Sequence, residues 1–205
     1  MTGVQTCALP ILDFYTLDEF KKFISVIENQ DYKLFFSILY YMGLRVGELQ
    51  ALTWNEIKND EIHITKTLTT KIKGELYTIS TPKTKNSIRV LPIPKNLLNE
   101  LNSLKNREKM KKSYSNDWFV FGGNLPYRES TITKYKNQYC KMANLKQIRI
   151  HDFRHSCASL LINKGATITL VSKYLGHSNV SITLNVYSHF YKIELNEITE
   201  MIGNL

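Results

Sequence analysis

Apolar residues recur with the spacing of an α-helix along much of this chain. Thr16 and Glu19 form a capping-box pattern, and apolar residues then return every three or four positions, which predicts a helix over 17–29. A second helix should follow and end at Gly43, because glycine readily adopts the left-handed conformation that ends helices. A third, short helix should begin at Arg45. The first part of the chain is therefore predicted to be helical.

The middle of the chain changes to the alternation of apolar and polar residues that is typical of strands. Turn-forming residues, including Gly74 and Pro82, separate the alternating segments. These segments cover residues 62–64, 76–79 and 88–91. The pattern predicts a small, three-stranded antiparallel sheet.

The helical period returns after Pro94. A lysine-rich run over 105–112 should form an exposed helix end or loop. Further helices are expected at about 129–142, 152–164, 168–175, 179–187 and 191–202. No internal repeat or linker interrupts the pattern, so the fold class should be α+β, mostly helical, in one domain.

Residues 1–11 differ from everything that follows. Their sequence, MTGVQTCALPI, is similar to the translation of a common sequencing adapter. We therefore expect the natural chain to begin near Leu12 and to lack its upstream part, with one domain over 12–205. The alternative is a genuine N-terminal tail.

Composition narrows the class of protein. A chain of 205 residues can bury a core without disulfides or a metal. It has neither an apolar run long enough for a membrane span nor a signal peptide, so a soluble, cytoplasmic protein is expected. Cys7, Cys140 and Cys157 lack the spacing of metal ligands, and the latter two should be isolated buried thiols. We expect no metal and no cofactor.

The charge of the chain suggests a polyanionic partner. Its 27 Lys and Arg residues outnumber its 18 Asp and Glu residues and give a formal charge of +9. Cationic proteins gain affinity for nucleic acid by releasing counterions from phosphates. A solvated lysine-rich face would give the same composition, so charge alone leaves both interpretations open.

Five segments carry a more specific signal. In order, they read GLRVGELQAL, TPKTKNSIRVLPIP, HDFRHSCASLLINKG, YLGH and TLNVYSH, and they are spread over most of residues 16–190. In order and spacing they resemble the tyrosine recombinase (phage integrase) family. Within it, they are most similar to integrases of Gram-positive conjugative transposons and temperate phages. The resemblance implies a tyrosine-recombinase catalytic core, from which upstream DNA-binding domains are missing.

The resemblance also assigns a catalytic set. Its members are Arg45, Lys83, His151, Arg154, His177 and Tyr187. Guanidinium groups grip phosphate oxygens in a planar fork, which suits the two arginines, and a phenol can form a covalent phosphodiester intermediate. In the family, the lysine protonates the leaving oxygen, the first histidine transfers protons and the second donates a hydrogen bond to phosphate.

Some of these assignments have rivals among the cationic residues. Arg45 could be a surface arginine paired with Glu48, which the resemblance instead makes its orienting partner. Lys85 competes with Lys83, and charge alone does not separate them. The family pattern favours Lys83 and leaves Lys85 and Arg89 for phosphate contact or structure.

The nucleophile also has rivals, because the chain contains 12 tyrosines. Tyr174 and Tyr191 are the nearest, but neither lies in the segment that resembles the family's nucleophile region, as Tyr187 does. His155 is expected to pack or hydrogen-bond rather than react, and His189 is expected to be structural.

The resemblance implies a site-specific recombinase that cleaves and rejoins DNA through a 3′-phosphotyrosyl intermediate. Double-stranded DNA would be its partner, a homotetramer on DNA its assembly, and DNA-bending or directionality proteins its accessory partners. A type IB topoisomerase shares this chemistry and is one alternative. A catalytically silent DNA-binding module is another.

Overall fold

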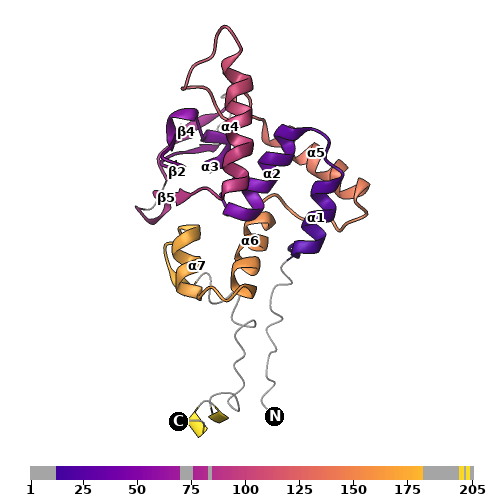
Figure 1. Cartoon of the computed structure of the whole chain (residues 1–205), viewed down its shortest axis with the longest axis vertical. Helices are drawn as coiled ribbons and strands as arrows, with labels where there is room; N and C mark the ends of the chain where they lie inside the picture. Colours follow the sequence, from indigo (N-terminus) through magenta and orange to yellow (C-terminus); the bar gives the residue numbers. More distant parts are fainter. Residues whose placement is uncertain (1–12, 70–75, 83–84, 182–198, 201, 204–205) are drawn as a thin grey trace, which may run out of the picture.

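The computed structural model of the protein describes residues 13–69, 76–82, 85–181, 199–200 and 202–203 (Figure 1). In these segments, no helix combines the length and apolarity that crossing a membrane requires. The prediction about residues 1–11 concerns residues outside the described part and stays a prediction.

The first two helices are bounded by side-chain caps. Thr16 and Glu19 form the predicted capping box at the start of α1 (Leu17–Ser25). The predicted extent of 17–29 is wrong at its end. Asn29 accepts hydrogen bonds from two backbone N–H groups at the start of α2 (Gln30–Met42), so it begins a new helix instead of continuing the first.

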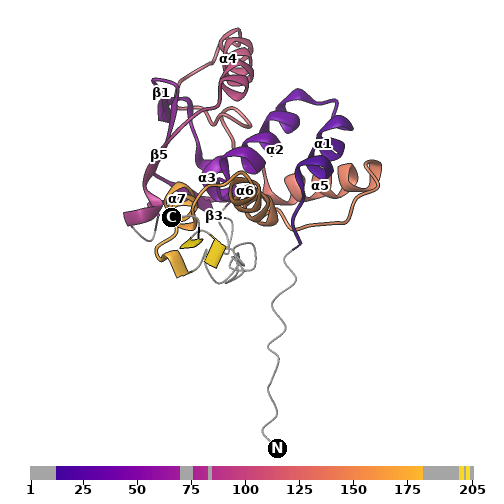
Figure 2. The ribbon, with the colours of Figure 1, turned by 60° about the horizontal axis from the view of Figure 1, so that its bottom comes forward.

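Helix α2 forms the centre of the core and packs against α1, α4 and α6 (Figures 1 and 2). Phe36 of α2 and Phe153 of α6 are buried, with ring centroids 5.5 Å apart. As predicted, α2 ends at Gly43, whose φ is +62°. The aromatic packing fixes the start of α6 against α2, which matters for the site.

Small antiparallel sheets are present, but the predicted membership is partly wrong. The strands are β1 (Ile57–Lys58), β2 (Glu61–Ile64), β3 (Thr67–Thr69), β4 (Thr78–Ser80) and β5 (Arg89–Pro92). Strand β2 pairs with β1 and β5, whereas β4 pairs with β3 in a separate sheet. Asn59 and Asp60, both with positive φ, form the tight turn that brings β1 onto β2. Alternation predicts a strand but not its partner.

Most of the remaining helices lie where the sequence predicts them. They are α3 (Val46–Ala51), α4 (Lys95–Lys109), α5 (Glu129–Met142), α6 (Asp152–Asn163) and α7 (Ile168–Leu175), with 3-10 turns η1 (Trp54–Glu56) and η2 (Lys85–Ser87). Helix α4 ends within the lysine-rich run, as expected. The predicted helices over 179–187 and 191–202 lie largely outside the described residues. Cys140 and Cys157 are buried free thiols, which confirms their prediction.

Candidate active site

Arg45 occupies the position between α2 and α3. It is the N-cap residue of α3, and its backbone N–H donates to Oε2 of Glu48 at 2.9 Å. Its side-chain Nη1 donates to Oε1 of the same carboxylate at 2.7 Å. The Arg45 side chain is 35% exposed, while that of Glu48 is 2% exposed. A buried carboxylate therefore holds a guanidinium that still reaches solvent, as the prediction of an orienting partner requires.

Arg154 lies in the first turn of α6 and is buried, with 3% exposure. Its Nη1 donates to the carbonyl of Gly43 at 2.8 Å, and its Nη2 donates to the carbonyl of Leu175 at 2.5 Å. Burial, with Arg45 nearby, lowers the pKa of Arg154 to about 9. The group therefore remains a cation at neutral pH and would gain from an anion beside it.

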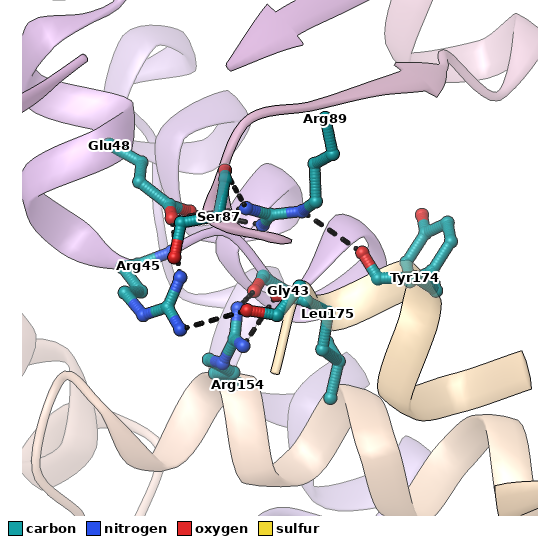
Figure 3. A network of polar contacts seen from close by, with 9 residues as sticks. Gly43, Arg45, Glu48, Ser87, Arg89, Arg154, Tyr174 and Leu175 are labelled. Carbon is teal, nitrogen blue, oxygen red and sulfur yellow. Dashed lines mark hydrogen bonds and ion pairs between the residues drawn. The ribbon is translucent and has the colours of Figure 1, made fainter. Parts of the chain in front are cut away.

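Three guanidinium groups converge on the end of α7 (Figure 3). Arg89 donates to the carbonyl of Tyr174 at 3.0 Å, and Arg154 donates to that of Leu175. Arg45 donates to the carbonyl of Gly176 at 3.3 Å. The last carbonyls of a helix lack intrahelical partners and carry partial negative charge, so they attract cations. The end of α7 thus gathers arginines that lie far apart in the sequence.

His177 follows this helix end directly. Gly176 has a φ of +69°, and a Cβ atom there would lie 2.8 Å from the carbonyl oxygen of Asn86. Only a glycine fits this close approach, as its place in the sequence suggested. His177 is half-buried, and burial, followed by the charges of Arg154 and Arg45, lowers its pKa to about 3. A neutral imidazole at this position can still donate one hydrogen bond.

His151 is the N-cap residue of α6, one helical turn before Arg154. Part of its ring reaches the surface, but the loss of hydration on its inner side, and then His155, lowers its pKa to about 4. The two histidine rings meet edge to face with centroids 4.9 Å apart. This contact is the packing expected of His155, while its lack of a chemical role stays a prediction. A neutral His151 can accept a proton, as a general base must.

Lys83 and Tyr187 lie outside the described residues, so their assignments stay predictions. The chain beside Lys83 is described: the side-chain amide of Asn86 in η2 donates to the carbonyl of Ser178 at 3.5 Å. The described turn η2 therefore lies against the turn that carries His177. Burial raises the pKa of the rival Tyr174, which makes it a poorer nucleophile.

Sequence reasoning left the role of Arg89 open between phosphate contact and structure. In the structure, its side chain is 7% exposed and its guanidinium pairs with Glu48. The alternation of residues along a strand could have indicated that Arg89 is buried. Arg89 lies two residues before the buried Leu91 and therefore on the same face of β5.

Comparisons with known proteins show the family to which this chain is similar. Residues 13–194 match the sequence model of the Phage integrase family. The chain is 35% identical over 204 residues to the ICEBs1 integrase of Bacillus subtilis, covering 95% of this chain and 55% of that protein. It is 30% identical over 214 residues to a XerC-like tyrosine recombinase of Caldanaerobacter subterraneus, covering 95% of this chain and 54% of that protein.

A solved structure of the Tn1549 transposon integrase in complex with a circular intermediate DNA has a similar fold. It superimposes with a TM-score of 0.78 at 25% identity, over 93% of this chain and 66% of that one. The mostly helical fold with small antiparallel sheets is thus that of a tyrosine recombinase catalytic domain, as expected. Because the family match spans nearly the whole described chain, this protein belongs to the phage integrase family of tyrosine recombinases.

Proposed function

We propose that this chain cleaves and rejoins strands of double-stranded DNA through a covalent bond to Tyr187. The observation that carries the proposal is the convergence of Arg45, Arg154 and His177 at the end of α7. Arg45, Arg89 and Arg154 surround one carboxylate, that of Glu48, which leaves the cluster with excess positive charge. A scissile phosphate would supply the missing anion.

The reaction proceeds as two balanced phosphoryl transfers. Tyr187 gives up its phenol proton to water, its oxygen attacks phosphorus in line, the bond to the 5′ oxygen breaks, and Lys83 gives that oxygen a proton. The product is a 3′-phosphotyrosyl ester. In the reverse direction, a 5′-hydroxyl attacks phosphorus while His151 accepts its proton, the bond to the Tyr187 oxygen breaks, and the phenolate takes up a proton from water. Arg45, Arg154 and His177 stabilise the charge on the phosphate oxygens in both directions.

DNA is the proposed partner, and a homotetramer on DNA is the proposed assembly. The positive charge of the chain supports binding to a polyanion. The similar transposon integrase was solved with a circular intermediate DNA. DNA-bending or directionality proteins are proposed as accessory partners, as the resemblance to the family implies.

Covalent trapping tests the proposal. The substrate is a library of duplexes with a randomised centre and a nick that lets the cleaved end diffuse away, so no target sequence need be known. Wild-type protein should form an adduct that survives detergent, and peptide mapping should place the DNA on Tyr187. Tyr187→Phe should abolish the adduct and leave noncovalent binding nearly unchanged, while the matched Tyr191→Phe variant should retain both.

The alternatives give different results in the same assay. A silent DNA-binding module would form no adduct with any member of the library. A type IB topoisomerase would form the adduct but only reseal the original strand, whereas a recombinase joins strands from two duplexes. An adduct that maps to Tyr174 or Tyr191 would show that the nucleophile is wrongly assigned.

A further inference from the structure

Arg89 is a buried cation that the proposed chemistry does not use. It lies at the start of β5, and the strand turns its side chain inwards. The side chains of Arg89 and Glu48 are 7% and 2% exposed, respectively. Removing two such charges from water is costly unless both are fully hydrogen-bonded. The contacts of Arg89 therefore show what its burial accomplishes.

Every guanidinium nitrogen of Arg89 donates a hydrogen bond. Nη1 and Nη2 donate to Oε1 and Oε2 of Glu48 at 3.1 and 3.0 Å, a planar fork on the carboxylate. Nη1 also donates to the carbonyl of Ser87 at 3.2 Å, and Nε donates to that of Tyr174 at 3.0 Å. One side chain thus joins α3, the η2–β5 segment and α7 (Figure 3).

Arg89 and Arg45 share the Glu48 carboxylate. Oε1 of Glu48 accepts from both guanidiniums, and Oε2 accepts from Nη2 of Arg89 and from the backbone N–H of Arg45. Because a two-pronged ion pair fixes the plane of the carboxylate, the direction in which Glu48 holds the Arg45 guanidinium depends on Arg89.

Arg89 also supports the turn that carries His177. A Cβ atom on Gly176 would lie 3.0 Å from Cδ and 3.1 Å from Nη1 of Arg89. The turn therefore lies directly on the Arg89 side chain. A shorter residue at position 89 would leave the turn without this support.

We propose that Arg89 is a positioning residue for strand cleavage: it fixes Glu48, and through it Arg45, while it holds the His177 turn against the arginine cluster. This inference rests on the proposed function. Arg89 itself needs no contact with DNA, because its side chain is 7% exposed and each of its three nitrogens already donates to a protein group. A displacement of about 1 Å at a reacting group can reduce a rate about 100-fold.

The test compares Arg89→Gln and Arg89→Lys with Arg107→Gln, a variant of an arginine on α4 that pairs with Asp31. Single-turnover adduct formation at saturating DNA should slow about 10- to 100-fold in Arg89→Gln. DNA affinity and the rate in Arg107→Gln should stay within about twofold of wild type. Arg89→Lys keeps the charge without the fork and should have an intermediate rate.

The pH profile provides a readout that loss of stability alone would not change. In the described part of the chain, three positively charged side chains interact electrostatically with the Glu48 carboxylate. They are Arg45 at the N-cap of α3, Arg89 of β5 and Arg154 of α6. Burial would raise the pKa of Glu48, but Arg89, followed by Arg45, holds it below its usual value. In Arg89→Gln, the fall in cleavage rate at acidic pH should begin at a higher pH than in wild type. The Glu48 carboxyl, followed by NMR, should also titrate at higher pH.

The outcomes separate the inference from the proposed function. If wild type forms an adduct and both Arg89 variants match Arg107→Gln in rate and in the pH at which the rate begins to fall, the inference is wrong. An unchanged Glu48 titration in folded Arg89→Gln also overturns it, whether or not DNA is cleaved. If Arg89→Gln does not fold, a normal rate in folded Arg89→Lys overturns it. If wild type forms no adduct but the Glu48 titration shifts to higher pH in Arg89→Gln, the proposed function is contradicted and the inference about Arg89 is not.

Discussion

Arg154 donates a hydrogen bond across 111 residues of sequence to the backbone carbonyl of Gly43, at 2.8 Å. The bond joins the first turn of α6 to the end of α2 and places Arg154 beside Arg45, two residues after the glycine. Both proposed phosphate-binding arginines therefore lie at the C-terminal end of α2, Arg45 through the chain itself and Arg154 through its hydrogen bond to Gly43. Their surroundings differ, however, because Arg154 is buried and Arg45 is partly exposed.

Replacing either arginine by lysine should slow cleavage strongly, but only one replacement should destabilise the fold. A lysine lacks the two-pronged fork for phosphate oxygens. In Arg154→Lys, one ammonium cannot reach the carbonyls of both Gly43 and Leu175 in the same geometry, and a buried carbonyl without a partner costs about 1–3 kcal/mol. Arg45→Lys should melt close to wild type. Denaturant titrations measure the stability of both variants, and rates on a nicked suicide substrate measure their cleavage. Near-normal cleavage rates would contradict the assigned roles.

Gly43→Ala should destabilise the protein more than Gly165→Ala. Both residues have positive φ, so both replacements carry backbone strain of about 1–2 kcal/mol. At Gly43 the new Cβ would also lie 2.5 Å from Cδ2 of Leu175, whereas at Gly165 nothing lies within 4 Å. Crowding of this kind typically costs a further ~1–3 kcal/mol. Equal free energies of unfolding would show that α7 moves away from α2 at no cost.

The free energy of unfolding should fall as the pH drops from about 6.5 towards 4. The unfolded histidines titrate near pH ~6.5. Partial loss of hydration, together with neighbouring positive charge, lowers the folded pKa values of His151 and His177 to about 4 and about 3, so the unfolded chain binds protons first. Their contribution is present above pH ~6.5 and is lost as the pH falls through the folded values. The double variant His151→Gln/His177→Gln should show a shallower decline; an identical slope would contradict the assignment.

Cleavage should be insensitive to EDTA. The proposed site stabilises phosphate charge with Arg45 and Arg154, and phosphoryl transfer to a tyrosine needs no redox partner. The measurement is adduct formation with and without the chelator, followed by added magnesium. Activity that is lost in EDTA and restored by magnesium would refute this arrangement of roles.

Local sequence determined the helices because their signals are short-range. The Thr16–Glu19 capping box and the glycine at position 43 act through neighbours within a few residues, and both mark helix ends in the structure. The error at the end of α1 arose because the apolar period continues across Asn29, whose side chain starts a second helix. Motif order was informative for the same reason: it requires only residue identities and spacing, and the family match confirms it.

Tertiary structure decided which segments meet. Alternation marked the strand at β4 but could not show that it pairs with β3, since pairing depends on chain reversal elsewhere. Likewise, nothing local in the sequence indicates that Arg45, Arg89 and Arg154 all donate to the end of α7. Their convergence results from packing α2 against α6 and α6 against α7, which brings distant cations to carbonyls that lack helical partners. The sequence thus determined the residue types and most local elements, while long-range packing decided how they form one site.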